Sequence, residues 1–117
     1  MAAKPLEATV RFKPEAAIID LKGEIDGFAE QTLNAAYAQA SAENPKAIVL
    51  NFNQVNYINS TGIALIVNLL AQSRQANRRL LTYGLSGHYV EIFEVTRLSD
   101  FIGVFPDEVS ALAGAAV

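Results

Sequence analysis

The sequence predicts a single α/β domain whose central sheet is mixed but mostly parallel, with an N-terminal hairpin and about four helices. Three observations favour this class. The length of 117 residues fits one domain, and no shift in composition or internal repeat divides the chain. After an opening hairpin, strand-like and helix-like segments alternate. Residues 47–52 form a run that is apolar on both faces, which is typical of a strand at the centre of a covered sheet.

The opening hairpin is predicted from two short apolar segments at residues 9–12 and 17–21. Lys13-Pro14-Glu15 lies between them, and proline there favours a turn because its ring restricts φ and it cannot donate to a strand ladder. We expect residues 22–24 to end the second strand. The hairpin would then supply the antiparallel edge of the sheet.

A helix is predicted from Asp26 to about Ser41. Asp26 stands where an N-cap residue belongs, and Asn44-Pro45 ends the helix because a residue before proline avoids helical dihedrals. The apolar positions repeat with helical spacing and share one face: Ala29, Leu33, Ala36, Tyr37 and Ala40.

The central strand at residues 47–52 is followed by a short apolar link at 55–58. A second helix is then predicted from about Gly62 to Ala76. This helix is apolar almost all round as far as Leu70, so we expect it to be deeply packed. Arg78 and Arg79 follow it and place cations near the negative end of its dipole.

The C-terminal third continues the alternation. A strand is predicted at residues 80–83, a short helix at about 87–95 and a last strand at 101–105. Pro106 is expected at the first position of a terminal helix, with Asp107 and Glu108 in its first turn. The predicted domain spans residues 1–117, with its core at about 7–114.

Composition excludes several functional classes. Nine Lys and Arg against twelve Asp and Glu give a formal charge of −3, which disfavours a nucleic-acid partner because phosphate binding needs a basic face. The absence of Cys removes disulfides, thiolate zinc sites and cysteine nucleophiles. No apolar run reaches the roughly 18 residues that a membrane-spanning helix needs, and the first residues do not resemble a secretory signal. We therefore expect a cytoplasmic protein without membrane insertion.

Catalytic and cofactor signals are weak. His88 is the sole histidine, and a lone histidine in a loop-to-helix turn is more often a surface residue than a catalyst. No Gly-x-Ser-x-Gly elbow and no phosphate-cradling glycine loop is present. Glu24 and Asp26 are close in sequence, but carboxylates at this spacing are usually solvated. The sequence thus predicts neither an enzyme nor a bound cofactor or metal.

The informative segment is Ile58-Asn59-Ser60-Thr61-Gly62, where two hydroxyls lie at a strand-to-helix junction. One interpretation is an N-cap, in which Ser60 or Thr61 accepts a hydrogen bond from the first helical turn. The residues alone favour this interpretation. The other is a phosphorylation switch, because a phosphate at a helix N-terminus meets free N–H groups and adds about −1.5 to −2 charges.

A family resemblance enters with two motifs and their order. Gly23-Glu24-Ile25-Asp26 follows the hairpin, and Asn59-Ser60-Thr61-Gly62 opens the second helix after the central strand. Together they resemble the STAS domain, whose signature is similar to Gly-Glu-[Leu/Ile]-Asp and Asp-Ser-[Ser/Thr]-Gly. The resemblance covers residues from about 7 to 114 and implies a STAS-like fold. The family contains bacterial anti-sigma factor antagonists.

The resemblance implies partner switching. Such an antagonist binds a GHKL-type serine/threonine kinase that is also an anti-sigma factor, and this frees the sigma factor. Phosphorylation of the hydroxyl residue before the glycine breaks the complex, and a PPM-type serine/threonine phosphatase resets it. Position by position, the acceptor would be Thr61, with Ser60 the less favoured neighbour.

The resemblance also implies a contact surface for the kinase. Exposed apolar side chains near Thr61, of which Phe28 and Ile63 are the two candidates, would favour a docking surface over a plain helix cap. Polar positions on the second helix could extend it, namely Asn68, Gln72 and Gln75. The implied partner-binding residues are Asp26, Gly27, Phe28, Asn59, Ser60, Thr61, Gly62 and Ile63.

One residue departs from the family pattern. Asn59 stands where the family often has Asp, which keeps a turn-forming side chain but removes a negative charge beside the acceptor. The alternative function is therefore a scaffold or assembly subunit that is never phosphorylated, as in a stressosome-like complex or a lipid-transport accessory. A small-molecule binder ranks lower, because no phosphate-cradling loop supports it.

Overall fold

A computed structural model describes residues 4–117, and its architecture confirms the predicted fold class. One five-stranded sheet has the order β1-β2-β3-β4-β5. The first pair is antiparallel and the other three pairs are parallel, so the hairpin does form an edge. The strands are β1 (Glu7–Phe12), β2 (Ala17–Ile25), β3 (Ala47–Ile58), β4 (Arg79–Tyr83) and β5 (Gly103–Phe105).

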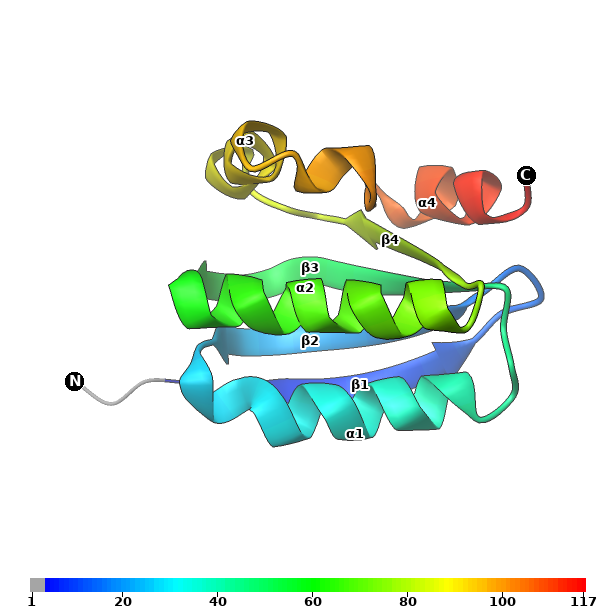
Figure 1. The fold of residues 1–117 in the computed structure, drawn as a ribbon, viewed down its shortest axis with the longest axis horizontal. Coiled ribbons are helices and arrows are strands. Elements are labelled where there is room, and N and C mark those ends of the chain that lie inside the picture. Colours follow the sequence, from blue (N-terminus) through cyan, green and yellow to red (C-terminus); the bar gives the residue numbers. More distant parts are fainter. Residues whose placement is uncertain (1–3) are drawn as a thin grey trace.

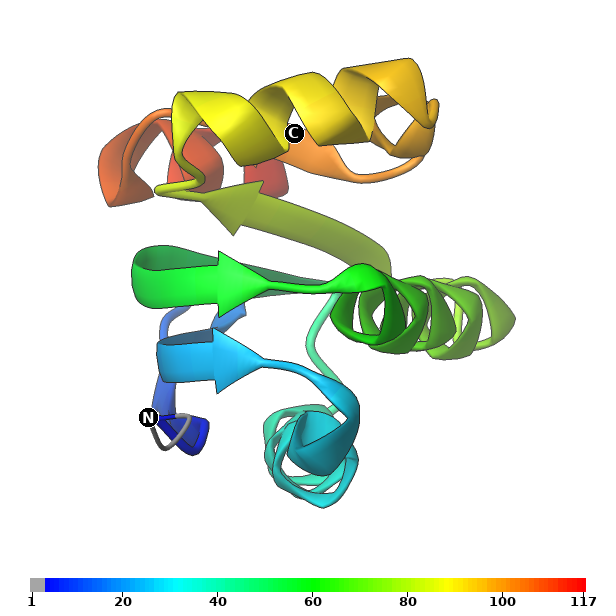
Figure 2. The ribbon, with the colours of Figure 1, turned by 90° about the vertical axis from the view of Figure 1, so that its left-hand side faces the viewer.

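Helices cover both faces of the sheet. α1 and α2 lie side by side on one face (Figures 1 and 2), while α4 packs on the other against β3, β4 and β5. Short 3-10 turns precede α1 and follow α3. The helices are α1 (Glu30–Ser41), α2 (Ser60–Gln75), α3 (Gly87–Val95) and α4 (Glu108–Ala115), and the 3-10 turns are η1 (Gly27–Ala29) and η2 (Leu98–Asp100).

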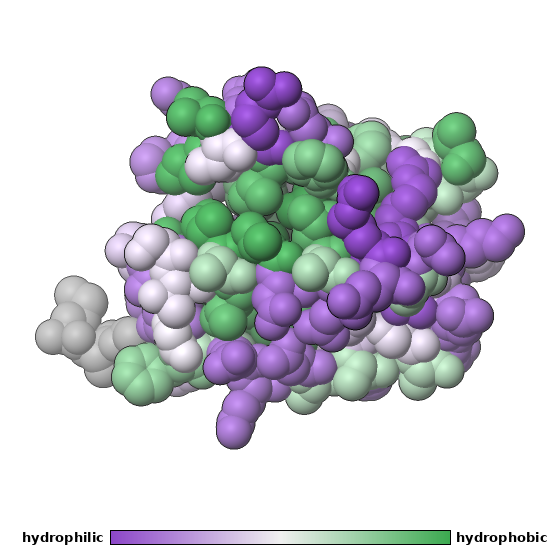
Figure 3. All heavy atoms as spheres, in the orientation of Figure 1, coloured by the Kyte–Doolittle hydropathy of each residue, from purple (hydrophilic) through white to green (hydrophobic). Residues whose placement is uncertain are grey.

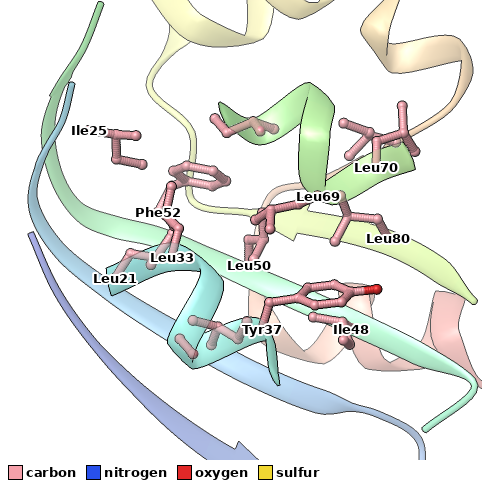
Figure 4. Close-up of a cluster of buried hydrophobic side chains, with 14 of the residues drawn as sticks. Leu21, Ile25, Leu33, Tyr37, Ile48, Leu50, Phe52, Leu69, Leu70 and Leu80 are labelled. Carbon is pink, nitrogen blue, oxygen red and sulfur yellow. The ribbon is translucent and has the colours of Figure 1, made fainter. Parts of the chain in front are cut away.

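The main core lies between the sheet and the α1–α2 layer. Leu33 and Tyr37 of α1 meet Leu50 of β3 and Leu69 of α2 in this layer (Figure 4). All four side chains are buried. Burial of this kind is the main favourable term in folding, so the core holds the N-terminus of α2 in a defined place relative to β2.

The two central strands are longer than predicted. β2 continues through Gly23 to Ile25, and β3 runs without interruption to Ile58, so the expected strand end and the expected link were both wrong. Gly23 allows the extension because it adopts a φ of +112°, which other residues rarely adopt, beside a shift in the β2–β3 register. The polar residues of β3 hid its length, because this half of the sheet has a solvent-exposed face.

The expectation that α2 is deeply packed was also wrong. Only one face is buried, while Val67 is 41% exposed. The reason is the position of α2 on the outside of the sheet, where α1 is its helical neighbour on one flank only. The helix begins at Ser60 rather than Gly62.

Smaller corrections concern element ends. The first helix starts as the 3-10 turn η1, and Asp26 caps that turn rather than α1. The last strand begins at Gly103 rather than Phe101, because Phe101 and Ile102 form the turn that follows η2 and donate their N–H groups to the Leu98 carbonyl. α4 begins at Glu108, so Pro106 lies before the helix rather than at its first position. Asp107 is the N-cap, and its carboxylate accepts a hydrogen bond from the Ser110 N–H.

A polar network fastens α4 to the sheet. Arg11 of β1 donates to Asp20 of β2 at 2.6 Å and to Glu108 of α4 at 2.7 Å, and the Tyr83 hydroxyl donates to Glu108 at 2.8 Å. The hydrogen bonds from Arg11 hold the pKa of Asp20 and of Glu108 below their usual values. Burial is the main cause that raises the pKa of Tyr83 to about 12, and the hydrogen bond to Glu108 is the second.

This network predicts a loss of stability in acid. A depressed carboxyl pKa stabilises the fold above the unfolded-state values near 4, and the contribution is lost as pH falls through the lower folded-state values. Replacing Glu108 with Gln should lower the free energy of unfolding by roughly 0.5–1 kcal/mol at pH 7, a small value because solvent partly screens the Arg11–Glu108 ion pair. The loss should be smaller at pH 3, because part of the contribution of the Glu108 carboxylate is already lost there. Urea denaturation at the two pH values measures this. The exposed Glu91→Gln is the control, and an equal Glu108→Gln effect at both pH values would contradict the prediction.

Candidate functional site

The residues singled out by the sequence meet at one edge of the sheet. β2 and β3 are parallel, so Ile25 and Ile58 pair at their carboxyl ends. η1 follows the first of these strands and α2 follows the second. Figure 2 looks onto this edge, where the start of α2 lies beside the turn that leads into α1. α3 is fastened to the same edge, because the Ile58 N–H donates to the Tyr89 hydroxyl at 2.8 Å.

The turn after β2 presents an aromatic side chain to solvent. The Asp26 carboxylate accepts a hydrogen bond from the Phe28 N–H at 2.9 Å, which closes the turn. Phe28 itself is 95% exposed, although its neighbour Ala29 is buried. A phenyl ring of this exposure contributes nothing to the core, so a role in folding does not explain it.

Asn59, not a hydroxyl residue, caps α2. Its side-chain oxygen accepts the Gly62 N–H at 2.8 Å, and its carbonyl accepts the Ile63 N–H at 2.9 Å. The N-cap interpretation of Ser60 and Thr61 was therefore wrong. Asparagine is among the best N-cap residues, and its place one residue earlier moves both hydroxyls into the first turn. Both residues are exposed, and neither hydroxyl makes a hydrogen bond within the part of the chain that the structure describes.

Gly62 lets the first turn of α2 approach the end of β2. A Cβ atom at this position would overlap the Ile25 carbonyl oxygen and lie 2.8 Å from its carbonyl carbon. The same carbonyl oxygen accepts the Asn59 N–H at 3.2 Å. The glycine is buried, and this close packing explains why the position carries no side chain.

Thr61 adjoins the turn that carries Phe28. A Cβ atom built on Gly27 would lie 3.6 Å from the Thr61 methyl carbon, an ordinary van der Waals distance. Ile63 is half-buried and packs against the main core. The structure thus brings together an exposed aromatic ring, two exposed hydroxyls and the N-terminus of a 16-residue helix.

The polar positions predicted farther along α2 divide between two environments. Asn68 and Gln75 are exposed, as expected. Gln72 is half-buried and lines a pocket together with Tyr37 and Ser41 of α1. Within residues 4–117, no three His, Asp or Glu side chains group as metal ligands, and no helix has the length and apolar character to cross a membrane.

A comparison with known protein families identifies the family of this chain. The model of the STAS domain family matches residues 7–111. The chain belongs to the STAS domain family. The match includes both motifs on which the sequence resemblance rested, and it places the Thr61 turn inside the STAS domain rather than beside it.

Several relatives of this STAS domain carry regulatory names. An anti-sigma-B factor antagonist of Listeria monocytogenes is 29% identical over 86 residues, covering 74% of this chain and 75% of the relative. The crystal structure of an anti-sigma factor antagonist from Mycobacterium paratuberculosis has a TM-score of 0.79 and 18% identity, covering 99% and 98% of the two chains. The Bacillus protein SpoIIAA, solved in its phosphorylated form, has a TM-score of 0.67 and 19% identity, covering 88% of this chain and 95% of its own. The likeness to the two solved structures concerns the fold.

Sequence reasoning missed another set of surface residues on the STAS domain. Val67 and Arg74 are exposed on α2, and Phe101, after η2, is 55% exposed. The signal was ambiguous, because a helix that is apolar all round does not indicate which apolar side chain remains uncovered.

Proposed function

We propose that the protein is an anti-sigma factor antagonist that binds a GHKL-type serine/threonine kinase and is switched off by phosphorylation at Thr61. A PPM-type phosphatase would restore the active form. In this proposal the chain is a cytoplasmic regulator, not an enzyme. It would present its surface to the kinase and supply the hydroxyl that the kinase modifies.

The observation that carries the proposal is that Asn59, and not a hydroxyl residue, caps α2. Asn59 makes the cap, and the exposed Thr61 lies beside Gly27, in the turn that also carries the exposed Phe28. An exposed phenyl ring beside an unused hydroxyl suits a docking surface, because the ring gains most when a partner covers it. The regulatory names of the relatives and the phosphorylated form of SpoIIAA support the same function.

Thr61 suits the acceptor role better than Ser60. The Thr61 side chain adjoins Gly27, so a kinase that covers Phe28 would also cover Thr61. A phosphate there would lie at the N-terminus of α2, where the helix dipole and free N–H groups favour an anion. The neutral Asn59 adds no repulsion toward that phosphate. Phosphorylation would therefore leave the fold intact and change only the charge of the contact surface.

The test is phosphorylation in vitro. The chain is incubated with ATP and each purified GHKL-type serine/threonine kinase of the source organism, and intact and peptide mass spectrometry locate the phosphate. We expect one phosphate on Thr61, unchanged in Ser60→Ala and absent in Thr61→Ala. A complex with a kinase that forms without any phosphate transfer would favour the scaffold alternative, and a phosphate on Ser60 would reassign the acceptor.

A further inference from the structure

α2 has a second exposed flank that the proposed Thr61 surface does not use. Ile63, Val67, Leu70 and Arg74 follow one another at helical spacing and line the side of α2 away from α1. Gln72, on the opposite flank, lines the pocket next to α1. Among these four, Leu70 is buried, Ile63 is half-buried, and Val67 and Arg74 are exposed.

The segment after η2 forms the other wall. Phe101 lies across from Arg74, whose guanidinium carbon stands 5.3 Å from the centre of the ring. A pocket of about 310 Å³ lies at this end and is lined by Leu70, Arg74 and Phe101, among others. We call the surface formed by Ile63, Val67, Leu70, Arg74 and Phe101 the α2–η2 groove. Figure 3 shows apolar side chains gathered in a hollow between α2 and the α3–η2 segment.

The groove has the chemistry of a site for an amphipathic helix. The wall extends from Ile63 to Arg74, twelve residues that span about 17 Å along α2, which matches three turns of a second helix. A cation closes one end. No carboxylate of residues 4–117 forms a salt bridge with Arg74, and the cation–π contact with Phe101 holds the guanidinium at the rim. The groove therefore favours a helix that carries an acidic residue at that end.

We infer that an amphipathic helix of the kinase partner docks in the α2–η2 groove, with an acidic side chain against Arg74. The inference rests on the proposed function and extends its contact surface. Thr61 adjoins Gly27 on one flank of α2 and the groove follows the other, so the docked helix adds a second contact region to the proposed Thr61 surface. The helix would bury Val67 and the exposed part of Phe101, which raises affinity through apolar burial.

The absence of cysteine permits a direct test of where the partner lies. Val67→Cys carries an environment-sensitive fluorophore in the groove. Val109→Cys is the matched control, because Val109 is 79% exposed on α4, on the opposite face of the sheet. The probes are the purified GHKL-type kinases used above. We expect a blue shift at position 67 on binding and no shift at position 109.

Affinity measured by calorimetry completes the test. Val67→Glu and Arg74→Glu should each weaken kinase binding at least tenfold, while Val109→Glu leaves it unchanged, and thermal melts check that all three variants fold. The groove would be refuted if Val67→Glu and Arg74→Glu kept wild-type affinity and the fluorophore at position 67 showed no shift. If Thr61→Glu still bound more weakly in that case, the proposed function would stand without the groove. If no kinase binds the wild-type chain, both proposals fail.

Discussion

Thr61→Glu is expected to weaken binding of the kinase partner about 100-fold, which corresponds to about 2.7 kcal/mol. The carboxylate imitates part of the phosphate charge in the centre of the proposed contact surface. Leaving one uncompensated charge in a desolvated interface costs about 2–5 kcal/mol, so no conformational change is needed. Thr61→Ala should keep wild-type affinity, because it adds no charge and Asn59 still caps α2. Isothermal calorimetry with the purified kinase measures all three proteins.

Two controls distinguish a charge effect at Thr61 from unfolding and from a general effect of added negative charge. A glutamate in the first turn is favoured by the helix dipole, so the unfolding temperature of Thr61→Glu should not fall. Gln39→Glu adds the same charge at an exposed position of α1 and should leave kinase affinity unchanged. Equal affinity for wild type, Thr61→Glu and Thr61→Ala would refute the switch at Thr61.

Gly62→Ala is expected to destabilise the fold by about 2 kcal/mol, against the usual preference of helices for alanine. Helix propensity alone predicts a gain of about 1 kcal/mol for glycine to alanine in a helix interior. The added methyl group, however, would overlap the Ile25 carbonyl oxygen, which is backbone and cannot move without shifting β2. The first turn of α2 would be pushed away from the sheet, and the Asn59–Ile25 hydrogen bond would weaken.

The control for Gly62 is Gly87→Ala. Gly87 also lies in the first turn of a helix, but a Cβ atom there meets nothing within 4 Å. Its substitution should be neutral or stabilising by up to about 1 kcal/mol. Chemical denaturation of both variants gives the free energies of unfolding. A stabilising effect of Gly62→Ala would show that the close approach of α2 to β2 relaxes without cost.

The sequence predicted which residues lie at the start of α2, but not which of them caps the helix. Asn59, Ser60, Thr61 and Gly62 are adjacent in the chain, so a short motif brings them to one place without any tertiary information. Which of them caps the helix depends on where α2 begins, and that is decided by the approach of Gly62 to Ile25. The sequence placed the helix start two residues late, so it assigned the cap to a hydroxyl.

By itself, the sequence determined the order of the elements, the hairpin at the sheet edge and the apolar character of β3 and α2. These follow from local periodicity and turn chemistry, which act over a few residues. The tertiary structure alone decided which apolar side chains stay exposed, because burial depends on neighbours that are distant in sequence. Phe28 and Val67 are uncovered since no other element packs over them, and Arg11 meets Glu108 only because α4 returns to the sheet. The surface on which the proposed function depends is therefore determined by tertiary packing and could not be predicted from local sequence periodicity.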